Sequence, residues 1–318
     1  MHELLDTIEA WQARGDAVAL ATVVQVSGSA PRPVGAKMAV SARGEIAGSV
    51  SGGCVEGAVV EIALEVIEHG RPQLVHFGIA DETAWSVGLM CGGQIDVYVE
   101  PIDARFEEIA HLMRTRRRFA VRTVVTGAAS GAKTILLDPF SEGALPVSGL
   151  RDTPDGLTFV DLIEPPARLY IIGGTHIAIA LTSIARTLGY HVTVIDPRQA
   201  FATPERFAHA DELVTEYPQR ALKPEMIDSS TCFAVVTHDP KVDDPALLIA
   251  LNSPACYIGA LGSRKTHAQR IERLKRAGCS DEQIARIHAP IGLDIGARTP
   301  QEIAVAIAAE MIQTRARR

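Results

Sequence analysis

The sequence is poor in cysteine, and its five cysteines are not arranged as pairs. They stand at positions 54, 91, 232, 256 and 279 of 318 residues, and no Cys-x-x-Cys occurs among them. An odd number of cysteines at these spacings fits neither a disulfide framework nor a zinc signature. The sequence therefore excludes a small disulfide-stapled fold and a zinc-ribbon module.

Long basic runs and long apolar runs are also missing. The longest basic run is Arg116-Arg117-Arg118, and 31 basic residues against 38 acidic ones give a net charge of −7. This balance argues against a protein that binds nucleic acid. No apolar run approaches the length of a membrane span, and residues 1–15 carry charges throughout, unlike a signal peptide. We expect a cytoplasmic protein without nucleic-acid or membrane partners.

The composition, with 47% hydrophobic and 22% charged residues, is that of an ordinary globular protein. We predict a fold of the α/β class. The length of the chain suits two domains. Up to residue 140, several short strand patterns and few helices predict a mixed α+β domain. Residues 141–166 lack periodicity and are rich in Gly, Pro and Asp, which predicts a linker.

From residue 167 to 318 apolar strands alternate with helical patterns, which predicts a Rossmann-like, doubly wound parallel domain. The last two helices are predicted to begin with capping boxes. In these, Ser280 stands three residues before Gln283, and Thr299 stands three residues before Glu302. The beginnings of both helices are therefore well defined by the sequence.

A glycine-rich turn with one thiol is the most distinctive feature of the first domain. It reads Ser51-Gly52-Gly53-Cys54-Val55-Glu56 and joins a predicted strand to an amphipathic helix. Unpaired N–H groups and the positive end of the helix dipole at that point favour a thiolate or another anion. Glu56, in the first turn of this helix, is expected to act against this and to raise the thiol pKa. The structural alternative is a small buried cysteine packed against glycines.

A second thiol stands beside a glycine pair in Cys91-Gly92-Gly93, directly before a predicted strand. Because the feature occurs twice in one domain, we assign any thiol chemistry to Cys54 and Cys91. The loop at residues 27–35 contains two prolines and two glycines and is predicted beside the Cys54 turn. Arg32 or Lys37 would supply positive charge there to an anionic ligand, or would be solvated surface bases.

The turn Gly173-Gly174-Thr175-His176 lies between a strand and a helix, where dinucleotide-binding folds carry G-x-G-x-x-G. Asp196 ends the next strand and is placed to bind a ribose hydroxyl. Thr175 replaces the second glycine, and its β-branched side chain is expected to crowd a pyrophosphate. The turn therefore indicates weak dinucleotide binding, a different ligand, or a domain that only packs.

Further polar residues are predicted at the carboxyl ends of strands, where open α/β sheets bind ligands. Thr237-His238-Asp239 follows one strand, and a turn at residues 259–265 follows another. In that turn Ser263 would cap a helix beside Arg264, which suits a phosphate. His176 and His238 are candidate acid–base groups, or hydrogen-bonding surface histidines.

Together these motifs resemble those of the xanthine dehydrogenase accessory protein family, the XdhC/CoxI family, over nearly the whole chain. In the first domain the resemblance rests on residues 27–32, 48–56 and 91–93. In the second it rests on residues 173–178, 196–198, 237–239, 259–264 and 290–294. The family commonly has Gly-Ala-Gly-His at the first turn of the second domain, so Thr175 is a departure from its pattern.

The resemblance implies a protein that binds molybdenum cofactor and protects it while a cysteine desulfurase installs the sulfido ligand. Such a protein then delivers the cofactor to a molybdenum hydroxylase of the xanthine dehydrogenase type. This interpretation makes the chain a chaperone rather than an enzyme, and a homodimer is expected. The alternatives are an NAD(P)-dependent oxidoreductase with His176 or His238 as proton donor, and a nucleotide-sensing assembly protein.

Under the family interpretation, Cys54 and Cys91 are expected near the molybdenum or the pterin and are the candidate metal ligands, because thiolates suit soft metals. The second domain is expected to hold a nucleotide, either that of the cofactor or NAD(P). The residues assigned to cofactor binding are Ser51, Gly52, Gly53, Cys54, Glu56, Cys91, Gly92, Gly93, Gly173, Gly174, Thr175, His176, Asp196, Arg198, Thr237, His238, Gly262, Ser263 and Arg264.

Overall fold

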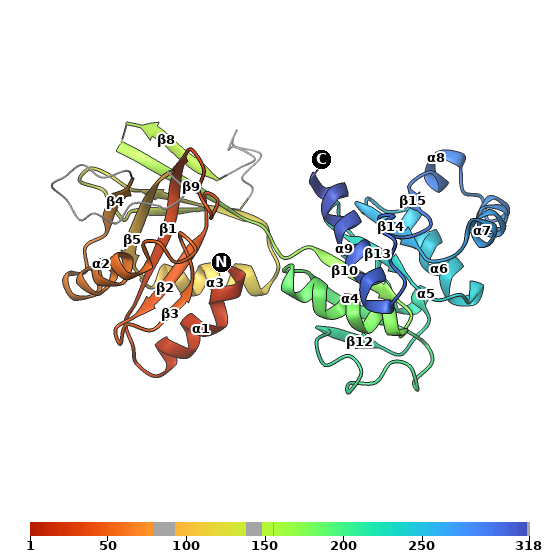
Figure 1. The fold of residues 1–318 in the computed structure, drawn as a ribbon. Coiled ribbons are helices and arrows are strands. Elements are labelled where there is room, and N and C mark those ends of the chain that lie inside the picture. Colours follow the sequence, from red (N-terminus) through yellow and green to blue (C-terminus); the bar gives the residue numbers. More distant parts are fainter. Residues whose placement is uncertain (79–92, 138–147, 155, 317–318) are drawn as a thin grey trace. The chain divides into compact units, whose positions relative to one another are not determined.

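The computed structural model describes residues 1–78, 93–137, 148–154 and 156–316, which form two compact units (Figure 1). The first unit spans Met1–Pro165 and the second spans Pro166–Arg318. None of the helices in the described part of the chain has the length and hydrophobicity that crossing a membrane requires.

The first unit contains a five-stranded antiparallel sheet in the order β3-β2-β1-β5-β4 and a four-stranded antiparallel sheet in the order β7-β6-β9-β8. Its elements are α1 (His2–Ala13), β1 (Val18–Ser27), β2 (Lys37–Ser41), β3 (Ile46–Gly48), α2 (Glu56–His69), β4 (Gln73–Phe77), β5 (Gln94–Pro101), α3 (Arg105–Arg114), β6 (Phe119–Val124), β7 (Lys133–Leu136), β8 (Gly149–Thr153) and β9 (Gly156–Ile163).

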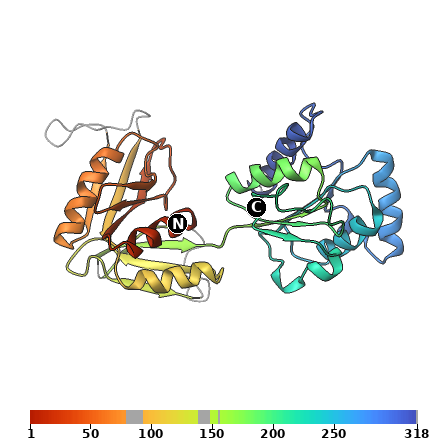
Figure 2. The same ribbon diagram turned by 90° about the horizontal axis from the view of Figure 1, so that it is seen from below.

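The five-stranded sheet is covered on both faces, which explains why residues 18–24 of β1 are all buried. Side chains alternate between faces along a strand, so Ala21 and Val23 pack with Val59 of α2 on one face. Leu20 packs on the other face with Phe106 of α3, as well as with α1 and the second sheet. Figure 2 shows α2 and α3 on different sides of this sheet.

We predicted a linker at residues 141–166, and this prediction is wrong for much of the segment that the structure describes. Residues 149–153 and 156–163 form β8 and β9, and β9 pairs along the whole of β6. The glycines and aspartates of this stretch indicated a linker, but its partner β6 is distant in sequence and only folding supplies it. These strands complete the second sheet of the first unit.

The second unit contains a six-stranded sheet in the order β12-β11-β10-β13-β14-β15, and every neighbouring pair is parallel. Its elements are β10 (Arg168–Ile172), α4 (His176–Thr187), β11 (His191–Ile195), β12 (Glu212–Val214), α5 (Pro218–Ala221), the 3₁₀ helix η1 (Pro224–Met226), β13 (Cys232–Val235), α6 (Pro240–Leu251), β14 (Tyr257–Ala260), α7 (Arg264–Arg276), α8 (Asp281–Ile284), β15 (Ile287–His288) and α9 (Pro300–Ala316). This arrangement confirms the predicted Rossmann-like, doubly wound domain.

Alternation along β10 divides the core of the second unit into two layers. Ile172 packs with residues of α6 and α7, whereas Ile171 packs with residues of α4 and α9. The strand order reverses between β10 and β13, and ligands of such folds bind at the carboxyl ends of the strands near that point. The predicted turns after β10, β11, β13 and β14 all lie at this edge.

Both predicted capping boxes are confirmed. The Ser280 hydroxyl accepts the N–H group of Gln283, and the Gln283 side chain accepts the N–H group of Ser280. Thr299 and Glu302 exchange the same two hydrogen bonds before α9, at 3.2 Å and 2.9 Å. These contacts are local, so the sequence alone is sufficient to find them.

Candidate functional site

The Glu56 carboxylate organises the Cys54 turn. Glu56 is the first residue of α2, and its oxygens accept the Ser49 hydroxyl at 2.6 Å. They also accept the backbone N–H groups of Ser51 at 2.9 Å and Gly53 at 2.8 Å. The Ser51 hydroxyl donates to the same carboxylate. The Glu56 side chain thus holds the turn together by hydrogen bonds to the residues of the turn.

Two serine hydroxyls take the remaining N–H groups of the turn. The Ser51 hydroxyl accepts the N–H groups of Cys54 and Val55, both at 3.0 Å, and the Ser49 hydroxyl accepts that of Gly52 at 2.8 Å. The expectation of unpaired N–H groups beside Cys54 is therefore wrong. An anion site needs free donors, and the N–H groups of the turn from Ser51 to Val55 are bonded to the chain's own side chains.

Glu56 also sets the charge beside the thiol. Burial raises the pKa of its carboxyl group, but the hydrogen bonds from Ser49 and Ser51 outweigh burial and lower the pKa to about 2. The Glu56 carboxylate is therefore charged at neutral pH. Cys54 is half-buried at the margin of the core under α2, so its thiol is a partly accessible group.

The loop after β1 contacts parts of both cysteine–glycine motifs. A Cβ atom on Gly52 would lie 3.6 Å from the Pro31 side chain. At Gly93 a Cβ atom would lie 2.0 Å from the backbone oxygen of Ser29, so only glycine fits there. Cys91-Gly92 lies outside the described residues, and the assignment of the second thiol stays a prediction.

Arg32 and Lys37, the predicted bases of this loop, are both engaged. Arg32 donates from Nε to the Ser49 oxygen at 3.3 Å, which ties the loop to the Cys54 turn. Lys37 is 4% exposed, and its Nζ atom lies 2.7 Å from Asp161 Oδ2. Beside them a groove of about 350 Å³ is lined by residues 32–37, Ser148 and residues 161–164. Lys37 is therefore neutralised, and Arg32 is the base that keeps part of its surface exposed.

At the first turn of the second unit, the Asp196 carboxylate accepts hydrogen bonds from neighbouring residues of the same chain. Its carboxylate accepts the Gly174 N–H group at 2.7 Å and the Arg198 N–H group at 2.9 Å. The Arg198 guanidinium adds bonds of 2.9 Å and 2.6 Å, and Asp196 is 0% exposed. Burial raises the pKa of Asp196, but Arg198 and Gly174 outweigh it and the pKa is lowered. Four hydrogen bonds use the acceptor capacity that a ribose hydroxyl would need.

Thr175 and its surroundings form a closed turn. The Thr175 hydroxyl accepts the Ala178 N–H group at 3.3 Å and caps α4. A Cβ atom on Gly174 would lie 2.5 Å from the Phe201 oxygen, so the segment after Asp196 packs directly against the turn. His176 is exposed at the start of α4.

A buried polar chain that the sequence did not reveal connects the neighbouring turns. The Thr237 hydroxyl donates to Asp243 Oδ1, and Arg270 Nη2 lies 3.5 Å from Asp243 Oδ2. Arg270 is 1% exposed, donates to the Leu261 oxygen at 2.8 Å, and within the described residues has no hydrogen-bond partner at Nε or Nη1. Burial raises the pKa of Asp243 and lowers that of Arg270. The only local sign of this polar chain in the sequence was the carboxylate of Asp243, one turn into the helix that follows Thr237.

Thr237 also touches the first turn, since a Cβ atom on Gly173 would lie 2.2 Å from Thr237 Cγ2. The structure thus brings Gly173, Thr237 and the Leu261–Gly262 turn together at one edge of the sheet. Ser263 caps α7 as predicted, because its hydroxyl accepts the Thr266 N–H group at 3.2 Å. The other predicted residues of these turns, His238 and Arg264, are exposed.

Two further thiols meet in the second unit. The sulfur atoms of Cys232 and Cys256 lie 3.3 Å apart, where β13 and β14 begin. The contact with Cys256, together with burial, raises the pKa of Cys232. The sequence assigned thiol chemistry to Cys54 and Cys91 alone, because nothing in the chain order brings these two cysteines together. They lie at the amino ends of the strands, away from the edge with the glycine turns.

Comparisons with known proteins agree with this architecture. A family model described as the XdhC and CoxI family matches residues 11–78, and one described as the XdhC Rossmann domain matches residues 169–311. A crystal structure of a xanthine dehydrogenase from Bacillus halodurans has the same fold, with a TM-score of 0.81 at 24% identity over 99% of this chain and 96% of that chain.

Two curated proteins are similar over most of their length. A probable xanthine dehydrogenase subunit of Bacillus subtilis (strain 168) is 30% identical, over 99% of this chain and 98% of that protein. The molybdenum cofactor insertion chaperone PaoD of Escherichia coli (strain K12) is 29% identical, over 95% of this chain and 84% of that protein.

Proposed function

The chain belongs to the XdhC and CoxI family, and we propose that it binds molybdenum cofactor and inserts it into a molybdenum hydroxylase of the xanthine dehydrogenase type. The main support is the similarity to a molybdenum cofactor insertion chaperone over 95% of the chain. A chaperone of this kind binds and releases its cargo and catalyses no reaction on it.

The geometry of the Cys54 turn supports this proposal. The turn has its N–H groups bonded internally, so the Cys54 thiol is the group it offers to a ligand. Among the described residues no three His, Cys, Asp or Glu side chains gather as a metal site. The molybdenum of a dithiolene cofactor brings ligands of its own, and a thiolate such as that of Cys54 suits such a soft centre.

Binding through a thiol depends on pH. A thiol that binds a metal releases its proton, so metal binding through Cys54 would be weaker at lower pH. We extend the proposal to sulfuration, with a cysteine desulfurase as a second partner while the cofactor is held.

The NAD(P)-dependent oxidoreductase is the weaker candidate. Its cofactor would need the Asp196 carboxylate as an acceptor, and Arg198 and Gly174 occupy that carboxylate. The segment at Phe201 also packs on Gly174, where a pyrophosphate would need space.

Anaerobic purification followed by mass spectrometry and metal analysis tests the proposal. We expect molybdenum and pterin in equal amounts with the wild-type protein and at least tenfold less with Cys54→Ser. Cys279→Ser is the matched control, because Cys279 is buried in the core of the second unit. Retention of neither molybdenum nor pterin by the wild type, together with failure to activate a cofactor-free hydroxylase, would refute the proposal.

A further inference from the structure

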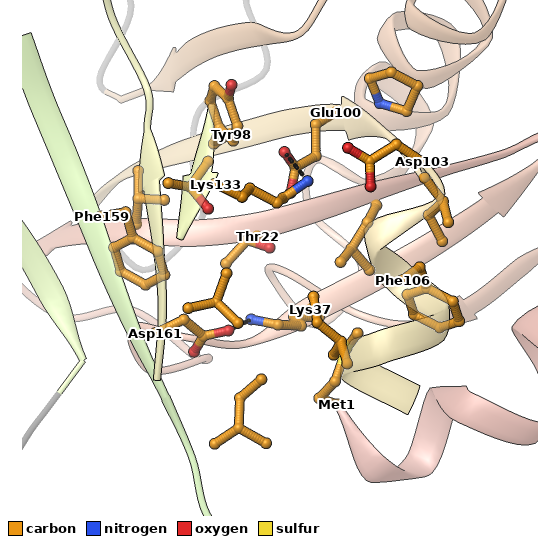
Figure 3. Close-up of a pocket in the computed structure, with 18 residues that line it drawn as sticks. Met1, Thr22, Lys37, Tyr98, Glu100, Asp103, Phe106, Lys133, Phe159 and Asp161 are labelled. Carbon is orange, nitrogen blue, oxygen red and sulfur yellow. Dashed lines mark ion pairs between the residues drawn. The ribbon is translucent and has the colours of Figure 1, made fainter. Parts of the chain in front are cut away.

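A cavity between the two sheets of the first unit has no role in the function described so far. It leaves about 50 Å³ for the centres of water molecules. At 10–15 Å³ for each centre this is room for roughly four waters. Most of its wall is apolar, and Figure 3 shows the lining side chains, which include Leu20, Val24, Phe106, Val121 and Phe159.

Two ion pairs cross the cavity from sheet to sheet. Lys37 of β2 lies 2.7 Å from Asp161 of β9, and Glu100 of β5 lies 2.8 Å from Lys133 of β7. All four side chains line the cavity, and the two pairs balance in charge. Asp103 and the amino-terminal residue Met1 also line the cavity, and the two balanced pairs suit a neutral polar ligand.

Glu100 is the more deeply buried carboxylate of these two pairs. It is 8% exposed, and its Oε2 atom lies 2.8 Å from the ammonium of Lys133. Burial raises the pKa of Glu100, and Lys133 counteracts burial only in part. The Lys133 ammonium is the donor beside this buried carboxylate, so a ligand that supplies further donors would be bound favourably.

A carboxylate next to an ammonium is complementary to a ring edge with two N–H donors next to a carbonyl. The carboxylate accepts both donors in parallel, and the ammonium donates to the carbonyl oxygen. Apolar walls with Phe106 and Phe159 suit the faces of a flat ring. We propose that this cavity binds the 2-amino-4-oxopyrimidine edge that pterins and guanines share, with Glu100 on the amino side and Lys133 on the carbonyl.

The groove beside the Cys54 turn shares part of its wall with this cavity. Lys37, Asp161 and Ile163 line both the groove and the cavity. The groove is bordered by the loop that also contacts Gly52 through Pro31. The inference rests on the proposed function for the source of the ring, since the pterin of a molybdenum cofactor carries this edge.

Titration of the full-length protein with free pterin, followed by its fluorescence and by calorimetry, tests the inference. We expect one site per chain, and at least tenfold weaker binding of lumazine, which has a carbonyl in place of the amino group. Guanosine distinguishes the two sources: binding comparable to that of pterin would assign the site to a nucleotide base, and weaker binding would assign it to the pterin.

The variant Glu100→Gln is expected to weaken pterin binding at least tenfold. The double variant Glu100→Gln with Lys133→Met removes both charges, so it keeps the fold and should still lose the preference for pterin over lumazine. Arg114→Ala, which breaks an exposed pair with Glu9, is the control and should leave binding unchanged.

The outcomes separate the two proposals. Equal affinity for pterin and lumazine, or no binding of pterin and guanosine to a folded wild-type protein, would overturn the cavity assignment. Undiminished molybdenum and pterin in the purified double variant would overturn it while the proposed function stands. Binding of added pterin that depends on Glu100, in a protein that is purified without molybdenum or pterin and fails to activate a cofactor-free hydroxylase, would support the cavity and refute the proposed function.

Discussion

The backbone N–H group of Gly53 donates to the Glu56 carboxylate at 2.8 Å, so the first residue of α2 binds back to the glycine pair before Cys54. This contact makes the turn a rigid support for a thiol. Its contribution to stability and its effect on the thiol are both open to direct measurement.

Glu56→Gln should destabilise the protein by about 1–3 kcal/mol at pH 7, because Gln cannot accept all the hydrogen bonds that the carboxylate accepts. The folded pKa, about 2, lies below the ordinary value of 4.5. The carboxylate therefore stabilises the fold above pH 4.5 and loses this effect as the pH falls towards 2. Urea unfolding at pH 7 and pH 3 measures it, with Glu61→Gln on the exposed face of α2 as the control. An equal deficit at both pH values would contradict this account.

Cys54 should react with a maleimide in the native protein, whereas Cys232 and Cys279 should react only after unfolding, because both are buried. Peptide mass spectrometry over a time course identifies each labelled site. Labelling of Cys279 at the rate of Cys54 would show that the core opens faster than this structure implies.

Gly173→Ala should destabilise the second unit by more than Gly189→Ala. Both glycines have positive φ, +109° and +80°, but only at Gly173 does a Cβ atom meet a neighbour, Thr237 Cγ2. The backbone strain should cost ~1–2 kcal/mol at either site, with about 1–3 kcal/mol more at Gly173 from overpacking. Thr237→Ser removes Cγ2, so in the Gly173→Ala background it should recover part of the loss. Equal melting temperatures of the two alanine variants would disprove the close contact.

Asp243→Leu and Arg270→Met should each cost about 3–5 kcal/mol, because each leaves the other charge buried and unpaired. The double variant should be more stable than the sum of the two losses predicts, since it removes both charges. Chemical unfolding of the four proteins gives the coupling energy. Additive losses would mean that the two side chains do not interact across their 3.5 Å separation.

The sequence by itself determined the architecture of the second unit. Strands of a parallel sheet covered on both faces are continuous apolar runs, as at 169–172 and 232–235, and such runs are visible without a structure. The capping boxes at Ser280 and Thr299 were also visible, because each depends on residues three apart. The cysteine–glycine motifs and the family resemblance came from the same local patterns.

Only the tertiary structure decided which polar groups are free. Asp196 looked like an open acceptor until Arg198 and Gly174 filled it, and the N–H groups beside Cys54 looked unpaired until Ser49, Ser51 and Glu56 took them. The pairs Glu100–Lys133, Asp243–Arg270 and Cys232–Cys256 join residues far apart in the chain. A residue's identity gives the hydrogen bonds it is able to make, but the neighbours that folding brings to it decide which of them remain for a ligand.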